Sequence, residues 1–210
     1  MAPLRILDPT GLYHVMSRGN FRQLMFLDDD HFAKYVRLVD RVARRWQWIV
    51  LDWCLMPNHI HLLVQLQTGG LSEGMRELNG CFSRWSNLRT GRTGTGHLIK
   101  NRPLMVDVLR EGHLWELLGY IPLNPVRSGA VAEPCQWPWS GYRATLGLDN
   151  PFRFHQPWEL LRLFGGDRAQ ALARYQVLIR DSRARDGQVS WSDHVVSEAP
   201  LRASMVESPA

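Results

Sequence analysis

Cysteine is scarce in this sequence: only Cys54, Cys81 and Cys135 occur among its 210 residues. They show neither the CxxC spacing of a zinc or redox site nor the even number of a disulfide framework, which argues against a small secreted disulfide-rich protein. Long hydrophobic runs are missing as well, because charges or helix breakers interrupt every stretch of about 18 residues, the length that a membrane span needs. Proline and charged residues also interrupt the first twenty residues, so no signal peptide is recognisable. These absences predict a protein of the reducing cytoplasm with no membrane partner.

Lysine is almost absent, since Lys34 and Lys100 are its only occurrences and arginine supplies the rest of the 25 basic residues. The net charge is +5, but residues 1–110 carry 15 basic and 9 acidic side chains, whereas residues 111–210 carry 10 and 11. The segment 76–102 has Glu77 as its one acidic residue against Arg76, Arg84, Arg89, Arg92, Lys100 and Arg102. Such a concentrated basic segment is typical of a protein that binds a polyanion such as nucleic acid. The alternative interpretation is a solvated helix face.

Hydrophobic periodicity predicts the secondary structure of the first 130 residues. Strands are expected at 12–17, 48–56, 59–66 and about 104–109, with Pro57-Asn58 as the tight turn of a hairpin. Helices are expected after Asp28–Asp30, after Gly69-Gly70, and over 114–121. In chain order these elements give the split βαβ, or ferredoxin-like, arrangement, in which helices cover one face of an antiparallel sheet. The predicted fold class is therefore α+β.

The rest of the chain predicts a second, smaller unit. The glycine-rich segment 90–96 is expected to be a mobile loop, and the Pro/Trp-rich stretch 134–140 is expected to close the first unit. Two helices follow near 157–164 and 167–183, and the polar residues 186–210 predict a loose tail. We therefore expect a domain at 1–148 and a C-terminal helical extension with a loose tail at 149–210.

The sharpest local feature is the pair His59 and His61. Successive side chains of a strand point to opposite faces, so both imidazoles lie on one face while Ile60 and Leu62 take the other. Two imidazoles about 7 Å apart along a strand can converge on one metal ion. The alternative is two unrelated histidines on a half-exposed strand.

Two further features are candidates for chemistry. Tyr120 and Asn124 are four residues apart, hence on one helix face, and the Asn124 amide oxygen is a hard ligand. The alternative is an ordinary buried tyrosine near a helix end. The turn at 17–22 places the basic residues Arg18 and Arg22 around a glycine. The alternative interpretation of this segment is a solvated loop without a role in chemistry.

Several sequence strings occur together in a recognisable order. They are HVMSRGN at 14–20, LMPNHIHLLV at 55–64, GHL at 96–98, YIPLNPVR at 120–127 and WPWSGY at 137–142. With these strings the chain resembles the single-tyrosine HUH (IS200-like) transposases, and most closely their REP-associated tyrosine transposase branch. The resemblance covers about residues 10–147 and implies that the first domain, 1–148, is an HUH transposase domain with a tyrosine-bearing helix.

The resemblance implies a role for each matched residue. Tyr120 would be the nucleophile that forms a 5′-phosphotyrosine, and His59, His61 and Asn124 would hold Mg²⁺ or Mn²⁺. The implied partner is single-stranded hairpin DNA, and the protein would act as a monomer or homodimer. The candidate DNA-binding residues are Arg18, Arg22, Arg76, Arg84, Lys100, Arg102 and Arg127.

The sequence departs from the family pattern at two positions near the tyrosine. Pro122 removes a helical hydrogen bond and predicts a kinked turn before Asn124, and Gly119 replaces a bulkier residue. Two alternatives to a transposase stay open: a catalytically silent binder of hairpin DNA or RNA, and an HUH nickase that does not transpose. A silent binder needs only the arginines, whereas a transposase needs His59, His61 and Tyr120.

Overall fold

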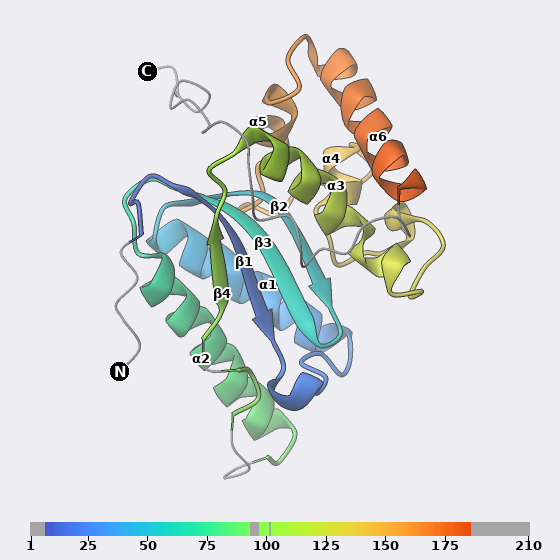
Figure 1. The fold of residues 1–210 in the computed structure, drawn as a ribbon. Coiled ribbons are helices and arrows are strands. Elements are labelled where there is room, and N and C mark those ends of the chain that lie inside the picture. Colours follow the sequence, from blue (N-terminus) through green and yellow to red (C-terminus); the bar gives the residue numbers. More distant parts are fainter. Residues whose placement is uncertain (1–6, 93–96, 101, 186–210) are drawn as a thin grey trace.

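The computed structural model describes residues 7–92, 97–100 and 102–185. Its centre is a sheet of four antiparallel strands: β1 (Leu12–Arg18), β2 (Trp48–Met56), β3 (His59–Leu66) and β4 (Leu104–Asp107). The order across the sheet is β2-β3-β1-β4, so the two strands that are first and third in the chain form its middle. This is the split βαβ arrangement, and the expected α+β fold is confirmed (Figure 1).

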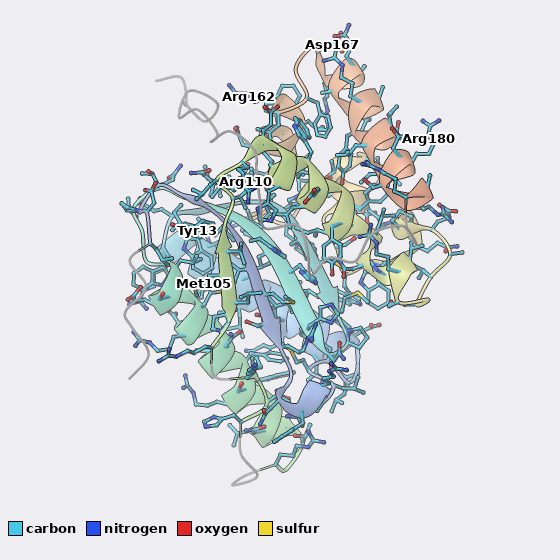
Figure 2. All side chains as sticks on the ribbon, viewed as in Figure 1. Tyr13, Met105, Arg110, Arg162, Asp167 and Arg180 are labelled. Carbon is cyan, nitrogen blue, oxygen red and sulfur yellow. The ribbon has the colours of Figure 1, made fainter. Side chains whose placement is uncertain are left out.

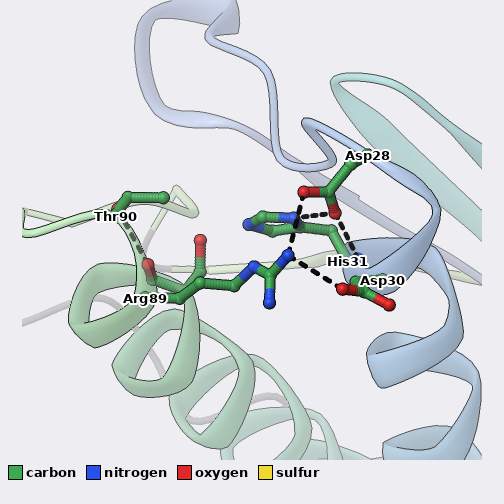
Figure 3. A network of polar contacts seen from close by, with 6 residues as sticks. Asp28, Asp30, His31, Arg89 and Thr90 are labelled. Carbon is green, nitrogen blue, oxygen red and sulfur yellow. Dashed lines mark hydrogen bonds and ion pairs between the residues drawn. The ribbon is translucent and has the colours of Figure 1, made fainter.

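Two long helices cover one face of the sheet, α1 (Asp29–Arg45) and α2 (Leu71–Arg89). The Asp28 carboxylate caps α1 by accepting a hydrogen bond from the His31 backbone N–H at 3.0 Å. Arg89, the last residue of α2, donates to Asp28 and Asp30 at 3.2 and 2.8 Å (Figure 3). The C-terminal end of α2 is therefore held against the N-terminal end of α1.

The opposite face carries the C-terminal half of the chain. The helix α3 (Glu111–Arg127) crosses the sheet at β2, and α6 (Arg168–Ala184) packs on α3. Shorter helices, α4 (Tyr142–Thr145) and α5 (Pro157–Arg162), complete this layer, and 3-10 turns η1 (Asn20–Arg22) and η2 (Pro134–Gln136) lie in the connections. Among the described residues, none of the helices is long and apolar enough to cross a membrane.

The sheet separates two hydrophobic cores, and a bulge in β2 changes which of its residues face each core. Trp48 and Val50 face the α1/α2 core, but so do Trp53 and Leu55, which have the opposite parity. The register against β3 shifts between Val50 and Asp52, so one extra residue is inserted there. The bulge turns the large Trp53 ring into the α1/α2 core and leaves Asp52 fully buried.

The Pro/Trp-rich stretch covers the free edge of β2. Leu55 donates its N–H to the Trp139 carbonyl at 2.8 Å, and Trp137 donates its Nε1–H to the Leu55 carbonyl at 3.0 Å. Gly141 donates to the Trp53 carbonyl at 2.9 Å. These bonds satisfy the backbone groups that an edge strand would otherwise expose.

Most expected elements are present, and the differences lie at their ends. The last strand stops at Asp107 rather than near 109, and the helix expected over 114–121 extends in both directions to become α3. The C-terminal helices match the two expected segments closely. The expected loop falls in part on residues 93–96, and the expected tail falls on 186–210; both of these ranges are outside the described residues.

Candidate active site

The two histidines of the HIH string lie on the face of the sheet that α3 covers. Their ring centroids are 5.0 Å apart and the rings are perpendicular. His61 is almost completely buried, whereas His59 is half-buried. Ile60 and Leu62 point into the α1/α2 core on the opposite face. The alternation expected from the sequence therefore places both imidazoles on one side of β3.

The helix α3 brings Tyr120 against this pair within the same chain. The Tyr120 ring meets the His61 ring edge to face, with 5.4 Å between centroids. Asn124, one turn further along α3, hydrogen-bonds through its side chain to both His59 and Tyr120. The structure thus brings together all four residues that the sequence singled out for the reaction centre.

Pro122 and Pro125 lie inside α3, and the helix continues through both. Pro125 has no N–H for the Ile121 carbonyl, and the Asn124 side chain supplies that donor. The Asn124 amide donates to the Tyr120 carbonyl at 3.0 Å and to the Ile121 carbonyl at 3.3 Å. Arg127 also donates to the Tyr120 carbonyl, at 3.1 Å. Because the Asn124 nitrogen is turned toward the backbone, its amide oxygen is left for the side on which His59 lies.

Packing explains why position 119 is a glycine, and the sequence alone did not reveal this. A Cβ atom at this position would lie 2.1 Å from Ser182 Oγ and 2.9 Å from Ser182 Cβ on α6. Since real Cβ atoms do not approach other atoms so closely, only glycine permits this contact. The absence of a side chain next to Tyr120 lets α6 pack directly on the tyrosine-bearing helix.

The electrostatics of the site keep its imidazoles neutral. Burial, assisted by the nearby Arg18 guanidinium, lowers the pKa of His59 to about 4. Burial also lowers the pKa of His61 well below its ordinary value, and the neighbouring rings of His14 and His59 act in the same direction. Both side chains therefore carry a nitrogen lone pair at neutral pH, which is the form that ligates metals.

The ring nitrogens are arranged as metal ligands usually are. The Nδ1 atom of His59 is 2.7 Å from Asn58 Oδ1, and the Nδ1 atom of His61 is 2.9 Å from His14 Nε2. The remaining atom His61 Nε2 is buried and has no hydrogen-bond partner among the described residues. Metal-bound histidines characteristically hold one nitrogen to an outer partner and direct the other at the ion. The residues present therefore fit a divalent ion.

A divalent ion held by His59 and His61 would need a third protein ligand, and among the described residues no acidic or sulfur-containing side chain is placed to provide it. In the described part of the chain, no group of three His, Cys, Asp or Glu side chains is placed to hold a metal ion. The Asn124 amide oxygen would be the third protein donor if the two histidines held an ion. Two imidazoles and an amide suit Mn²⁺ or Mg²⁺ and leave positions open for phosphate and water.

His14 is a residue of this site that sequence reasoning did not single out. It lies on β1 with its ring stacked on that of His61, at 5.2 Å between centroids and an angle of 10°. Burial lowers the pKa of His14 to about 4, so this ring is neutral too. The sequence did contain a signal for His14. His14 and Arg18 are four residues apart on β1, so their side chains lie on the same face of the sheet, and β1 pairs directly with β3.

Tyr120 is influenced by opposing effects. Burial raises its pKa above the ordinary value of 10.0, while the positive charges of Arg127 and Arg18 oppose this rise. The Arg127 guanidinium lies over the Tyr120 ring at 4.8 Å from the centroid. The cations favour an ionised phenol that burial alone would suppress.

The predicted DNA-binding residues fall into two groups. Arg18 pairs with His59 in the sheet, and Lys100 donates its backbone N–H to the Arg18 carbonyl at 2.9 Å, so both lie at the same end of β1 as the histidine pair. Arg22 lies in the adjoining turn η1. By contrast, Arg76 and Arg84 are exposed on α2, which covers the other face of the sheet.

Of the last two predicted contacts, Arg127 belongs to the reaction centre and Arg102 does not. Arg102 is exposed just before β4, and Arg127 lies on α3 beside Tyr120. The linear basic segment 76–102 is therefore not one continuous surface around the histidines.

A pocket of about 520 Å³ opens next to the histidines and Tyr120. It is bounded by β1, β4 and the first two turns of α3, with Met105 and Arg110 on the β4 side (Figure 2). His113 and Glu116 of α3 also line it. Its volume lies in the range of cofactor and small-ligand sites, so the reaction centre borders a space that can hold part of a substrate.

The chain matches one family model over part of its length and is similar in fold to a solved structure. Residues 10–102 match the family described as Transposase IS200 like. One solved structure, a REP-associated tyrosine transposase bound to a REP hairpin, is 19% identical, covers 74% of this chain and 94% of its own, and has a TM-score of 0.59. A putative transposase from Deinococcus radiodurans is 17% identical and covers 58% of this chain and 95% of its own, with a TM-score of 0.40. No curated protein matches the sequence.

Proposed function

We propose that this chain, whose residues 10–102 match the family described as Transposase IS200 like, is a metal-dependent strand transferase that cleaves and rejoins single-stranded hairpin DNA. The observation that carries this proposal is the contact between the Tyr120 and His61 rings within one chain, 5.4 Å between centroids. A phenol beside a potential phosphate-polarising site has the components of phosphodiester cleavage. The hairpin bound by the similar solved structure supports this class of substrate.

Each residue has a chemical task in this reaction. His59, His61 and Asn124 would hold Mg²⁺ or Mn²⁺, which when bound neutralises charge on a non-bridging phosphate oxygen. Tyr120 loses its phenolic proton and its oxygen attacks the phosphorus in line. A new P–O bond to Tyr120 forms as the bond from phosphorus to the 3′-oxygen breaks, and that oxygen takes up a proton.

The products are a 5′-phosphotyrosine and a free 3′-hydroxyl, so the phosphodiester energy is kept in the covalent bond. A second 3′-hydroxyl can attack the same phosphorus, and the Tyr120 oxygen then leaves. Arg127 over the phenol ring assists both directions, because a cation stabilises the phenolate that enters and leaves.

Other parts of the chain have supporting roles in this proposal. Arg18, Arg22 and Lys100 contact the DNA backbone near the reaction centre, while Arg76, Arg84 and Arg102 contact it further away. The extension that we assign to residues 149–210 supports the tyrosine-bearing helix through the packing of α6 on α3.

Tyr120→Phe tests the proposal because it removes one oxygen and keeps the ring packing. The wild type is incubated with Mn²⁺ and end-labelled hairpin oligonucleotides taken from palindromic repeats near its gene, and a denaturation-resistant protein–DNA adduct is measured. We expect the adduct in wild type and its complete loss in Tyr120→Phe. Tyr13→Phe is the matched control, since the Tyr13 hydroxyl donates to the Asp8 carbonyl at 3.1 Å and has a structural partner.

Three results would contradict parts of this assignment. An adduct that persists in Tyr120→Phe would reject Tyr120 as the nucleophile. Hairpin binding without any adduct in wild type would favour the catalytically silent binder. Cleavage without rejoining of a supplied strand would favour the nickase.

A further inference from the structure

The turn that follows β1 presents an aromatic side chain to solvent. Phe21 is 97% exposed, the highest value among the large exposed hydrophobic residues. Its backbone is left-handed, with φ of 51°, and that of Arg22 is left-handed too, with φ of 61°. Two successive non-glycine residues in this conformation are strained, and such strain accumulates at sites where a ligand is bound.

The turn keeps this conformation because its backbone is tightly held. Gly19 donates its N–H to the Asn58 carbonyl at 2.8 Å, and Gln23 donates to the Asn20 carbonyl at 3.0 Å. The Gln23 side chain adds a bond to the Leu98 carbonyl at 3.0 Å. These contacts come from both sides of the turn, so Phe21 is displayed by a rigid frame rather than by a loose loop.

The same frame connects Phe21 to the candidate reaction centre. Asn58, which accepts the hydrogen bond from Gly19, also faces the His59 Nδ1 atom with its side-chain oxygen at 2.7 Å. Arg18, one residue before this turn, pairs with His59 in the sheet. Exposed arginines also flank Phe21 in the sequence, with Arg18 three residues before it and Arg22 directly after it.

We propose that Phe21 is a stacking platform for an unpaired nucleobase of single-stranded DNA close to the scissile phosphate. This inference rests on the proposed function and names a residue that would hold its substrate. An exposed aromatic ring with exposed arginines close to it in the chain offers the two contacts that single strands make with proteins, base stacking and phosphate pairing. Stacking is tolerant of base identity, so Phe21 would position the strand rather than read its sequence.

Equilibrium binding tests this role independently of catalysis. The probe is a fluorescently labelled DNA hairpin with oligothymidine arms, and its dissociation constant is measured by anisotropy without metal. Phe21→Ala should weaken binding about tenfold or more, whereas Phe21→Trp should retain it. Trp158→Ala is the matched control, because Trp158 is 45% exposed but lies on α5, at the opposite end of the fold from η1 (Figure 1).

An abasic scan of the arms separates stacking from a general loss of structure. Removing the contacted base should weaken binding of wild type by the same factor as Phe21→Ala, and should have no further effect on that variant. Phe21→Gly should bind as weakly as Phe21→Ala while its thermal stability is maintained or raised, because glycine relieves the left-handed strain.

The outcomes distinguish the failure of this inference from that of the proposed function. Unchanged affinity of Phe21→Ala, or a change in self-association with unchanged DNA binding, would overturn the stacking role alone. Phe21-dependent binding without a Tyr120 adduct would overturn strand transfer and leave the stacking role standing. If the wild type did not bind the hairpin at all, both would be overturned.

Discussion

Replacing Asp52 by asparagine should stabilise the protein, and increasingly so as the pH rises. Asp52 lies at the bulge of β2 and is fully buried. Its Oδ1 atom accepts the Trp53 backbone N–H at 2.8 Å, whereas Oδ2 has no hydrogen-bond partner among the described residues. Burial raises the pKa of this carboxyl from 3.8 to about 8. The side-chain amide of Asp52→Asn would keep the acceptor for Trp53 and could not ionise.

The magnitude follows from proton linkage. Below pH 4 the carboxyl is neutral in both the folded and the unfolded chain, so wild type and variant have similar stability. Between pH 4 and pH 8 only the unfolded chain releases this proton, which lowers the free energy of unfolding of wild type by up to about 1.4 kcal/mol per pH unit. The variant lacks this loss, so its advantage should approach about 4 kcal/mol at pH 7.

Urea unfolding from pH 4 to pH 8 measures this difference. The matched control is Asp29→Asn, which removes the same charge from an exposed position at the start of α1. The buried His155 is close by, since a Cβ at Gly141 would lie 3.0 Å from both Asp52 Oδ1 and His155 Nε2. A pH-independent difference between Asp52→Asn and wild type would refute the reasoning and indicate an ionised Asp52 paired with a charged His155.

Two further predictions concern the surroundings of Tyr120 and His61. Gly119→Ala should destabilise the protein by about 1–3 kcal/mol in urea unfolding because its Cβ would overlap Ser182, and Ser182→Gly should restore most of that loss. His14→Leu should weaken Mn²⁺ binding about 10–100-fold by calorimetry, because it removes the outer partner of His61 Nδ1. His14→Gln, which keeps an acceptor, should weaken it less; equal affinity in His14→Leu and wild type would reject the positioning role.

Local patterns predicted the sheet and the histidine pair because both depend on the strict period of two along a strand. The spacing of Tyr120 and Asn124 made them candidates, but only the resemblance to a known motif connected Tyr120 with the two histidines. Tyr120 is far from His61 in the sequence, and the packing of α3 on β2 and α6 brings the two rings together. The C-terminal turns of α3 were missed because Pro122 and Pro125 favour a helix end, whereas the Asn124 side chain donates to the Ile121 carbonyl that Pro125 leaves without a backbone donor.

Two other features could not be predicted for related reasons. The bulge of β2 lies in a nearly continuous apolar run. Because apolar and polar residues do not alternate there, the sequence carries no pattern that a one-residue insertion would visibly break. The basic segment looks continuous along the chain, yet Arg76 and Arg84 lie on the helix layer and Lys100 lies beside β1. Linear charge density indicates how many cations are present, but not which face of the sheet carries them.

The alternation along β3 has a consequence for folding errors. If this strand paired one residue out of register, every side chain would change faces. His59 and His61 would enter the α1/α2 core without polar partners, while Ile60 and Leu62 would be left against α3. Buried imidazoles without hydrogen bonds are costly, so a mispaired sheet would lose stability and the metal-ligand pair at the same step. The alternation of these four residues therefore specifies both the register of β3 and the face on which the candidate ligands lie.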